Sequence, residues 1–169
     1  MNLIPSYKLY SAAWSTFSKG IKKPRPEIGQ MCHHMVLDLL ERAGLVKMER
    51  VKGKFINVND FQTLFQREDI NKEKLTGIEL TEAVNSQGLI LFIDVPDLAL
   101  GQHPAHSLVT MGNGEVAGYN NVGSLDPKQF DMFKNIIPDN NFRQFPLSCL
   151  SLKNKTMYGV SPQEFAQKI

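Results

Sequence analysis

An Asn-Gly pair, Asn113-Gly114, stands between two segments that are expected to be extended, Ala105–Met111 and Glu115–Asn121. Asn-Gly is strongly favoured in two-residue β-hairpin turns, because both central residues of such turns take positive φ angles. The sequence therefore predicts that these two segments pair as an antiparallel hairpin. If Gly112 also belongs to the loop, the register shifts by one residue.

Further strands are expected on either side of the hairpin. Leu89–Val95 is a short continuous apolar run bounded by Gly88 and Pro96, which is typical of a buried central strand. Phe142–Leu152 is expected to form one long strand or a strand pair. These segments and the hairpin predict a small antiparallel sheet.

Helical spacing of apolar residues and helix start signals account for most of the remaining chain. The start signals are Asp60, a capping box of Thr76 with Glu79, and the Asp126-Pro127 and Ser161-Pro162 pairs. The expected helices are Leu3–Ser18, Gln30–Ala43 closed by Gly44, Phe61–Arg67, Ile78–Val84, Pro127–Ile137 and a short C-terminal helix. The predicted fold class is α+β, with N-terminal helices packed on a small antiparallel sheet.

Two of these helices have a clear apolar stripe. In the first, the stripe contains Trp14 and Phe17, which are expected in the core. In the second, one side is apolar, and the other is expected to face solvent. The members of the apolar side are Cys32, Val36, Leu39, Leu40 and Ala43, and those of the solvent side are His34, Asp38, Glu41 and Arg42.

The length of 169 residues suits one domain, in which residues 1–44 form a helical part and residues 88–152 a sheet part. A net charge of +2 gives no reason to expect nucleic acid as a partner, and the cluster of Lys19, Lys22, Lys23 and Arg25 is interpreted as a solvated linker. The longest apolar run is too short to cross a bilayer. No signal peptide is recognised, so export would need a dedicated secretion machine.

The chain has two cysteines, too few for a disulfide framework. Cys149 lies in an apolar run and is expected to be inert in a buried strand. Cys32 falls in the first turn of its helix, where unpaired N–H groups and the helix dipole favour an anion. The position predicts a lowered pKa for the Cys32 thiol and a role as nucleophile.

The four histidines, His33, His34, His103 and His106, all lie close in sequence to Cys32 or to the first hairpin strand. In the hairpin, Asn121 faces His106 if the loop has two residues, and Asn120 faces it if the loop has three. Either amide could hold one imidazole nitrogen and leave the other free to accept the thiol proton. His33 and His34 are expected to flank the site without chemistry, because successive helix residues diverge by about 100°.

A Cys that opens a helix, followed by a strand that starts with His and a strand that ends in Asn, resembles papain-like thiol hydrolases. The segment from His106 to Gly123 is also similar to the His and Asp strands of bacterial effector thiol proteases and glutamine deamidases. The resemblance covers roughly Gly29 to Gly123. It implies a catalytic triad of Cys32, His106 and Asn121, with Asn120 as the alternative third member, and cleavage or deamidation of an amide through an acyl-thioester intermediate.

The chain departs from that family pattern at two points. Papain has an oxyanion-hole Gln six residues before its Cys, where this chain has Glu27, so Gln30 and the backbone N–H of Cys32 are the candidate oxyanion donors. The third member is Asn instead of the Asp common in effector enzymes.

The resemblance further implies a secreted bacterial effector or toxin that acts on a protein or peptide in the target-cell cytosol. It would need no cofactor, and a cognate inhibitor or a secretion chaperone would be a further partner. A cell-wall peptide amidase of the NlpC kind, acting in the target periplasm, is the alternative enzyme. The non-enzymatic alternatives are a zinc site of His103, His106, Cys32 and His33, and an interaction module that uses the Trp14 stripe.

Overall fold

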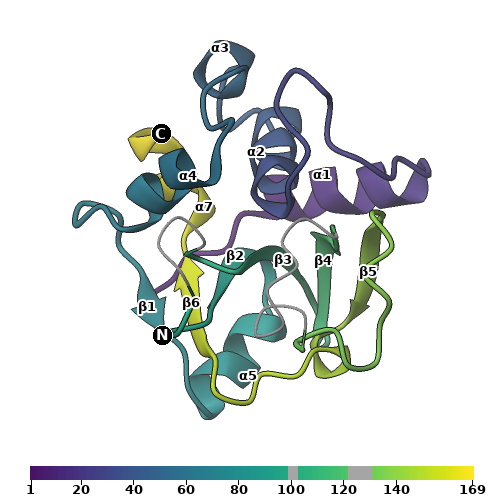
Figure 1. Cartoon of the computed structure of the whole chain (residues 1–169), viewed down its shortest axis with the longest axis vertical. Helices are drawn as coiled ribbons and strands as arrows, with labels where there is room; N and C mark the ends of the chain where they lie inside the picture. The colour runs from purple at the N-terminus through teal and green to yellow at the C-terminus, as the bar shows by residue number, and fades with distance from the viewer. Residues whose placement is uncertain (99–102, 122–130) are drawn as a thin grey trace.

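The computed structural model describes residues 1–98, 103–121 and 131–169. Its centre is a six-stranded sheet in the order β1-β6-β2-β3-β4-β5, in which every described pair is antiparallel (Figure 1). The strands are β1 (Glu73–Lys74), β2 (Gln87–Asp94), β3 (His106–Gly112), β4 (Glu115–Tyr119), β5 (Phe142–Pro146) and β6 (Thr156–Val160).

The sheet separates two apolar clusters, and β2 contributes to both because successive strand residues point to opposite faces. Ile90 and Phe92 join the cluster beneath α1, α2, α4 and α7, whereas Leu91 and Ile93 join the cluster that contains α5. The helices in the described part of the chain are α1 (Tyr7–Ser18), α2 (Cys32–Arg42), α3 (Met48–Val51), α4 (Val58–Phe65), α5 (Ile78–Val84) and α7 (Pro162–Lys168). The predicted α+β class is confirmed. None of these helices is long and apolar enough to span a bilayer.

Several helix boundaries agree with those predicted from the sequence, but the N-caps of α4 and α5 differ from the predicted ones. The side chain of Asn57 caps α4, which places Asp60 inside the first turn instead of at the cap. Helix α5 has the expected bounds, but it follows Gly77 without a side-chain cap, so the predicted box of Thr76 and Glu79 does not form.

Two predicted elements differ from the structure. Asp131–Ile137 forms turns instead of the second half of a helix, and residues 127–130 lie outside the described part of the chain. The predicted strand Phe142–Leu152 ends at Pro146, where a 3₁₀ turn, η1 (Leu147–Cys149), begins. Cys149 is therefore half-buried in a turn and not buried in a strand.

Helix α2 is buried on every side along Cys32–Leu40, because it lies between α1 and strands β3 and β4. The expectation that His34 and Asp38 face solvent is therefore wrong. The expected stripe of α1 is also displaced: Leu9, Ala13 and Thr16 are buried, Phe17 is half-buried, and Trp14 is 53% exposed.

The β3–β4 hairpin forms around Asn113-Gly114 as predicted, and its register changes within a few residues of the turn. Gly112 pairs with Glu115, which is the spacing of a two-residue loop, but Thr110 pairs with Val116 and Val109 with Ala117. The extra residue is a β-bulge at Met111 in β3. Beyond the bulge the strands follow the register expected for the longer loop.

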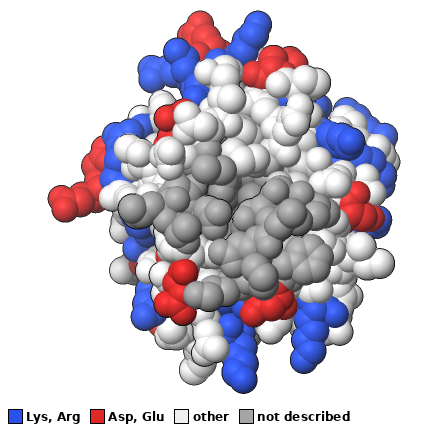
Figure 2. Space-filling model, viewed as in Figure 1, with Lys and Arg blue, Asp and Glu red and all other residues white. Residues whose placement is uncertain are grey.

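Charged side chains of both signs lie around the periphery of the face drawn in Figure 2. The described residues of that face form no continuous basic surface.

Candidate active site

Cys32 begins α2, and the helix places it against the start of β3. The backbone N–H of Ser107, the residue after His106, faces the Cys32 sulfur. Cys32 is only 5% exposed. The first turn of α2 and the beginning of β3 therefore form one buried contact.

The protonation state of Cys32 differs from the sequence-based expectation. Burial raises the pKa of the thiol to about 12, and the backbone N–H groups of Ser107, His33 and Cys32 oppose this only in part. Desolvation of the thiolate outweighs the favourable helix terminus. The prediction of a lowered pKa is wrong for this buried arrangement, in which Cys32 is a neutral thiol.

His106 is held by Asn120. Its Nε2 lies 3.0 Å from the Asn120 Oδ1, and both side chains are buried. An amide oxygen only accepts hydrogen bonds, so Nε2 carries the proton and Nδ1 is left as an acceptor. This is the tautomer that a general base requires.

The structure thus resolves which asparagine faces His106, and the assignment of Asn121 to that role is wrong. The bulge at Met111 shifts the register by one residue and brings Asn120 opposite His106. Asn121 makes a different contact: its Oδ1 accepts a hydrogen bond of 3.1 Å from the backbone N–H of Cys32.

His33 lies closer to the thiol than its helix position suggested. Its Nδ1 is 3.5 Å from the Cys32 sulfur and 2.5 Å from the Ser107 hydroxyl, and its ring stacks on Phe61 with centroids 4.1 Å apart. The turn angle of about 100° separates the Cβ atoms of successive helix residues, but the imidazole is long enough to fold back to the neighbouring sulfur. Sequence spacing carries no signal for this contact.

His34 has a structural role at the start of α2. The Met31 N–H donates to its Nδ1 over 3.0 Å, and its Nε2 lies 2.5 Å from the Phe55 carbonyl oxygen. Gly29 is needed beside it, because a Cβ at this position would lie 2.3 Å from the imidazole ring. His34 thus caps the helix that carries Cys32.

Burial also keeps the two site histidines neutral. It lowers the pKa of His106 to about 4, which the hydrogen bond from His106 to the Asn120 oxygen offsets only in part. Burial lowers the pKa of His33 to about 3, with further contributions from the charges that His106 and His34 would carry. At neutral pH both rings are uncharged and able to accept a proton.

The segment before α2 is fixed by the buried carboxylate of Asp38. The Arg25 backbone N–H donates to it over 2.6 Å, and the Arg25 and Arg42 side chains bind it over 3.0 and 2.5 Å. Arg25 also pairs with Glu41. The basic segment is therefore anchored at Arg25 and is not simply a solvated linker.

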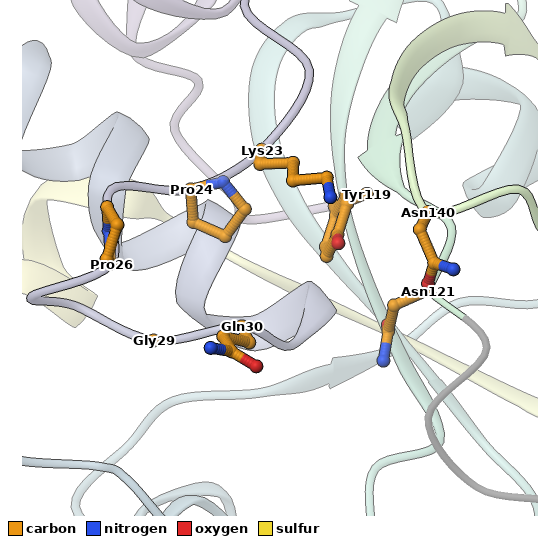
Figure 3. Close-up of a pocket in the computed structure, with 8 residues that line it drawn as sticks. All are labelled: Lys23, Pro24, Pro26, Gly29, Gln30, Tyr119, Asn121 and Asn140. Atoms are coloured by element: carbon orange, nitrogen blue, oxygen red, sulfur yellow. The ribbon is translucent and has the colours of Figure 1, made fainter.

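This anchored segment forms one wall of a pocket of about 590 Å³ next to Cys32. Figure 3 shows Gln30 and Asn121 at its lower side, with Lys23 and Tyr119 above them. Gly29, Asn140 and two prolines complete the lining. Gln30, the candidate oxyanion residue, therefore lines the same pocket as Asn121, whose Oδ1 accepts from the Cys32 N–H.

The alternative zinc site finds no support in the geometry. His103 uses both ring nitrogens, one 2.6 Å from Asp94 Oδ1 and the other 2.9 Å from the Leu98 carbonyl oxygen. Among the described residues, which include Cys32, His33, His103 and His106, no three potential ligands converge to hold a metal ion.

Comparisons of the chain with protein-family models, curated proteins and solved structures return no match.

Proposed function

We propose that this protein is a thiol hydrolase of the papain-like kind that acts on an amide bond, with Cys32 as nucleophile, His106 as base and Asn120 as the positioning residue. The observation that carries the proposal is the hydrogen bond from His106 Nε2 to Asn120, made where the start of β3 lies against the thiol of Cys32. It leaves Nδ1 as the only basic nitrogen of His106.

The reaction follows from these roles. His106 Nδ1 takes the thiol proton while the sulfur attacks the amide carbonyl carbon, and the tetrahedral oxyanion accepts from the backbone N–H of Cys32. The imidazolium then returns the proton to the leaving nitrogen, which departs as an amine or as ammonia. Water, deprotonated by the same imidazole, hydrolyses the acyl-thioester to a carboxylate and the free thiol.

The resting site is neutral, since the pKa of Cys32 is about 12 and that of His106 about 4. Proton transfer is therefore expected to accompany attack or to follow the entry of substrate, instead of preceding it as a stable ion pair. Since His106 must be unprotonated to act, the acidic limb of the rate profile is expected well below the ordinary histidine pKa of roughly 6.5.

The same chemistry serves a protease, a glutamine deamidase and a cell-wall peptide amidase. We favour a protein amide as substrate and delivery as a secreted bacterial effector or toxin, which rests on the resemblance of residues 106–123 to such enzymes. Intact-mass analysis of glutamine-containing peptides incubated with the protein separates side-chain deamidation from backbone cleavage.

The proposal is tested by kinetics of the variants on any peptide that the protein turns over. Cys32→Ala is expected to abolish turnover, whereas Cys149→Ala is expected to retain it. His106→Ala should lower kcat/KM by ~10²–10⁴, the usual contribution of a general base. Full activity of the Cys32→Ala variant would refute the proposal. If His106→Ala keeps its activity and His33→Ala loses it, the base is His33.

The role of Asn120 has its own test. Asn120→Ala is expected to lower kcat more than it raises KM, because the residue acts only through His106. Asn120→Asp should restore the rate in part and move the acidic limb of the profile to higher pH, since a carboxylate stabilises the imidazolium. An Asp variant with the wild-type pH profile would show that Asn120 does not act on the base.

A further inference from the structure

The contact between Asn121 and Cys32 places a protein group where the substrate is expected to bind. In acyl transfer by a helix-borne nucleophile, the nucleophile's own backbone N–H is an oxyanion donor. Here that N–H donates to the Asn121 side-chain oxygen over 3.1 Å, within the range of an ordinary hydrogen bond. The oxyanion donor is therefore already occupied.

The occupying group has the chemistry of a substrate. The Asn121 side chain is a primary carboxamide, as is the side chain of glutamine, and its oxygen lies at the donor through which a substrate carbonyl would be polarised. Asn121 also lines the 590 Å³ pocket, so a substrate that enters there contacts this side chain. Cys32 is 5% exposed in this arrangement.

A second observation concerns the side chain that holds His106. The side-chain nitrogen of Asn120 is buried and has no hydrogen-bond partner among the described residues. A buried donor without a partner is destabilising, because it has lost its hydrogen bonds to water. The site thus contains a donor that none of the described residues satisfies, and a carbonyl or carboxamide oxygen is the kind of group that would satisfy it.

We propose that the Asn121 carboxamide occupies the oxyanion donor of the resting enzyme, and that the carboxamide of a substrate glutamine or asparagine side chain displaces it. The inference rests on the proposed thiol hydrolase and specifies its substrate class as primary amides. Asn121 is then a competitor of the substrate and not a member of the catalytic triad.

The test compares two small thiol reagents on Cys32. Iodoacetamide carries a primary carboxamide, and its alkylation forms the S–C bond with loss of iodide and of the thiol proton. Methyl methanethiosulfonate has no carbonyl; it transfers a methylthio group to the sulfur with loss of methanesulfinate. The ratio of the two rate constants reports on carboxamide binding, because burial and thiol pKa affect both reagents.

Asn121→Ala is expected to raise the iodoacetamide-to-thiosulfonate ratio by roughly threefold to tenfold, the value of one net hydrogen bond. Asn121→Asp keeps an acceptor on the Cys32 N–H and binds more strongly at the helix terminus, so it should lower the ratio. Asn85→Ala, an exposed asparagine at the end of α5, is the matched control and should leave the ratio unchanged.

If Asn121→Ala accelerates both reagents equally, Asn121 merely covers the sulfur. If neither Asn121 variant changes the ratio, Asn121 does not compete with the carboxamide for the Cys32 N–H. Either result overturns the inference. Failure of the proposed thiol hydrolase function is seen separately. In that case His106→Ala does not change the rate at which either reagent modifies Cys32, whatever the iodoacetamide-to-thiosulfonate ratio.

Discussion

Lowering the pH from about 7 to about 5 is expected to cost the fold roughly 4 kcal/mol through His33 and His106 alone. Both side chains are buried, and burial holds their pKa values at about 3 and about 4, below the ordinary value of 6.5. A depressed histidine pKa means that the unfolded chain binds more protons. Stability is therefore complete above about pH 6.5 and is lost as the pH falls toward 4.

The magnitude depends little on the interaction between the two rings. At about pH 5 both are still neutral in the folded protein, so the cost is set by protonation of the unfolded chain, whose histidine pKa is near 6.5. Each histidine then contributes about 1.9 kcal/mol between the two pH values. Carboxylates with ordinary pKa values stay largely ionised over this range and add little.

The assay is urea unfolding of the wild type and of His106→Gln at both pH values. Glutamine can still donate to Asn120 from its side-chain nitrogen but does not titrate. The difference in unfolding free energy between the two proteins should change by about 1.9 kcal/mol with pH. His103, whose pKa the Asp94 hydrogen bond raises against the effect of burial, cancels in this comparison.

A pH-independent difference between the wild type and His106→Gln would show that His106 is not held neutral. The reasoning about the resting protonation state, and with it the expected position of the acidic limb, would then fail. The same comparison with His33→Gln tests the second ring independently.

Two further predictions concern the support of α2. Gly29→Ala places a Cβ 2.3 Å from the His34 ring. The change should destabilise the protein by ~1–3 kcal/mol in urea unfolding, because the ring or the loop must move. Gly53→Ala is the control: its Cβ meets nothing within 4 Å, so it reports the cost of a positive φ angle without a clash. Asp38→Ala should cost ~3–5 kcal/mol, since it leaves two arginines without their buried partner. Asp69→Ala removes a pair whose side chains are both exposed, and it should change the unfolding midpoint little. A smaller loss for Asp38→Ala than for Asp69→Ala would contradict the anchoring role of the buried carboxylate.

Local chemistry made much of the site predictable. Asn113-Gly114 strongly favours a hairpin turn between two extended segments, and the turn alone placed an asparagine against His106. Gly44 ends α2 as expected, with a positive φ of 74°. The choice between the two asparagines was not predictable, because the bulge at Met111 has no sequence signal that distinguishes it from a longer loop.

Properties that depend on packing could not be predicted. Asp38 lies at a position that a helical wheel assigns to solvent, but Arg25 covers it from a distant loop. The raised pKa of Cys32 has the same origin, since the helix start was visible in the sequence and the degree of burial was not. Both errors come from treating a helix as half-exposed when neighbouring elements surround it.

The adjacent asparagines just past β4 have one more consequence. Consecutive residues in an extended chain point in opposite directions, so Asn120 reaches His106 while Asn121 reaches the helix that carries Cys32. A single peptide unit, about 3.8 Å between Cα atoms, thus connects the base to the nucleophile's helix. A slip of the backbone in this segment relative to α2 would therefore disrupt both contacts together, whereas rotation of the Asn121 side chain alone would leave Asn120 on His106.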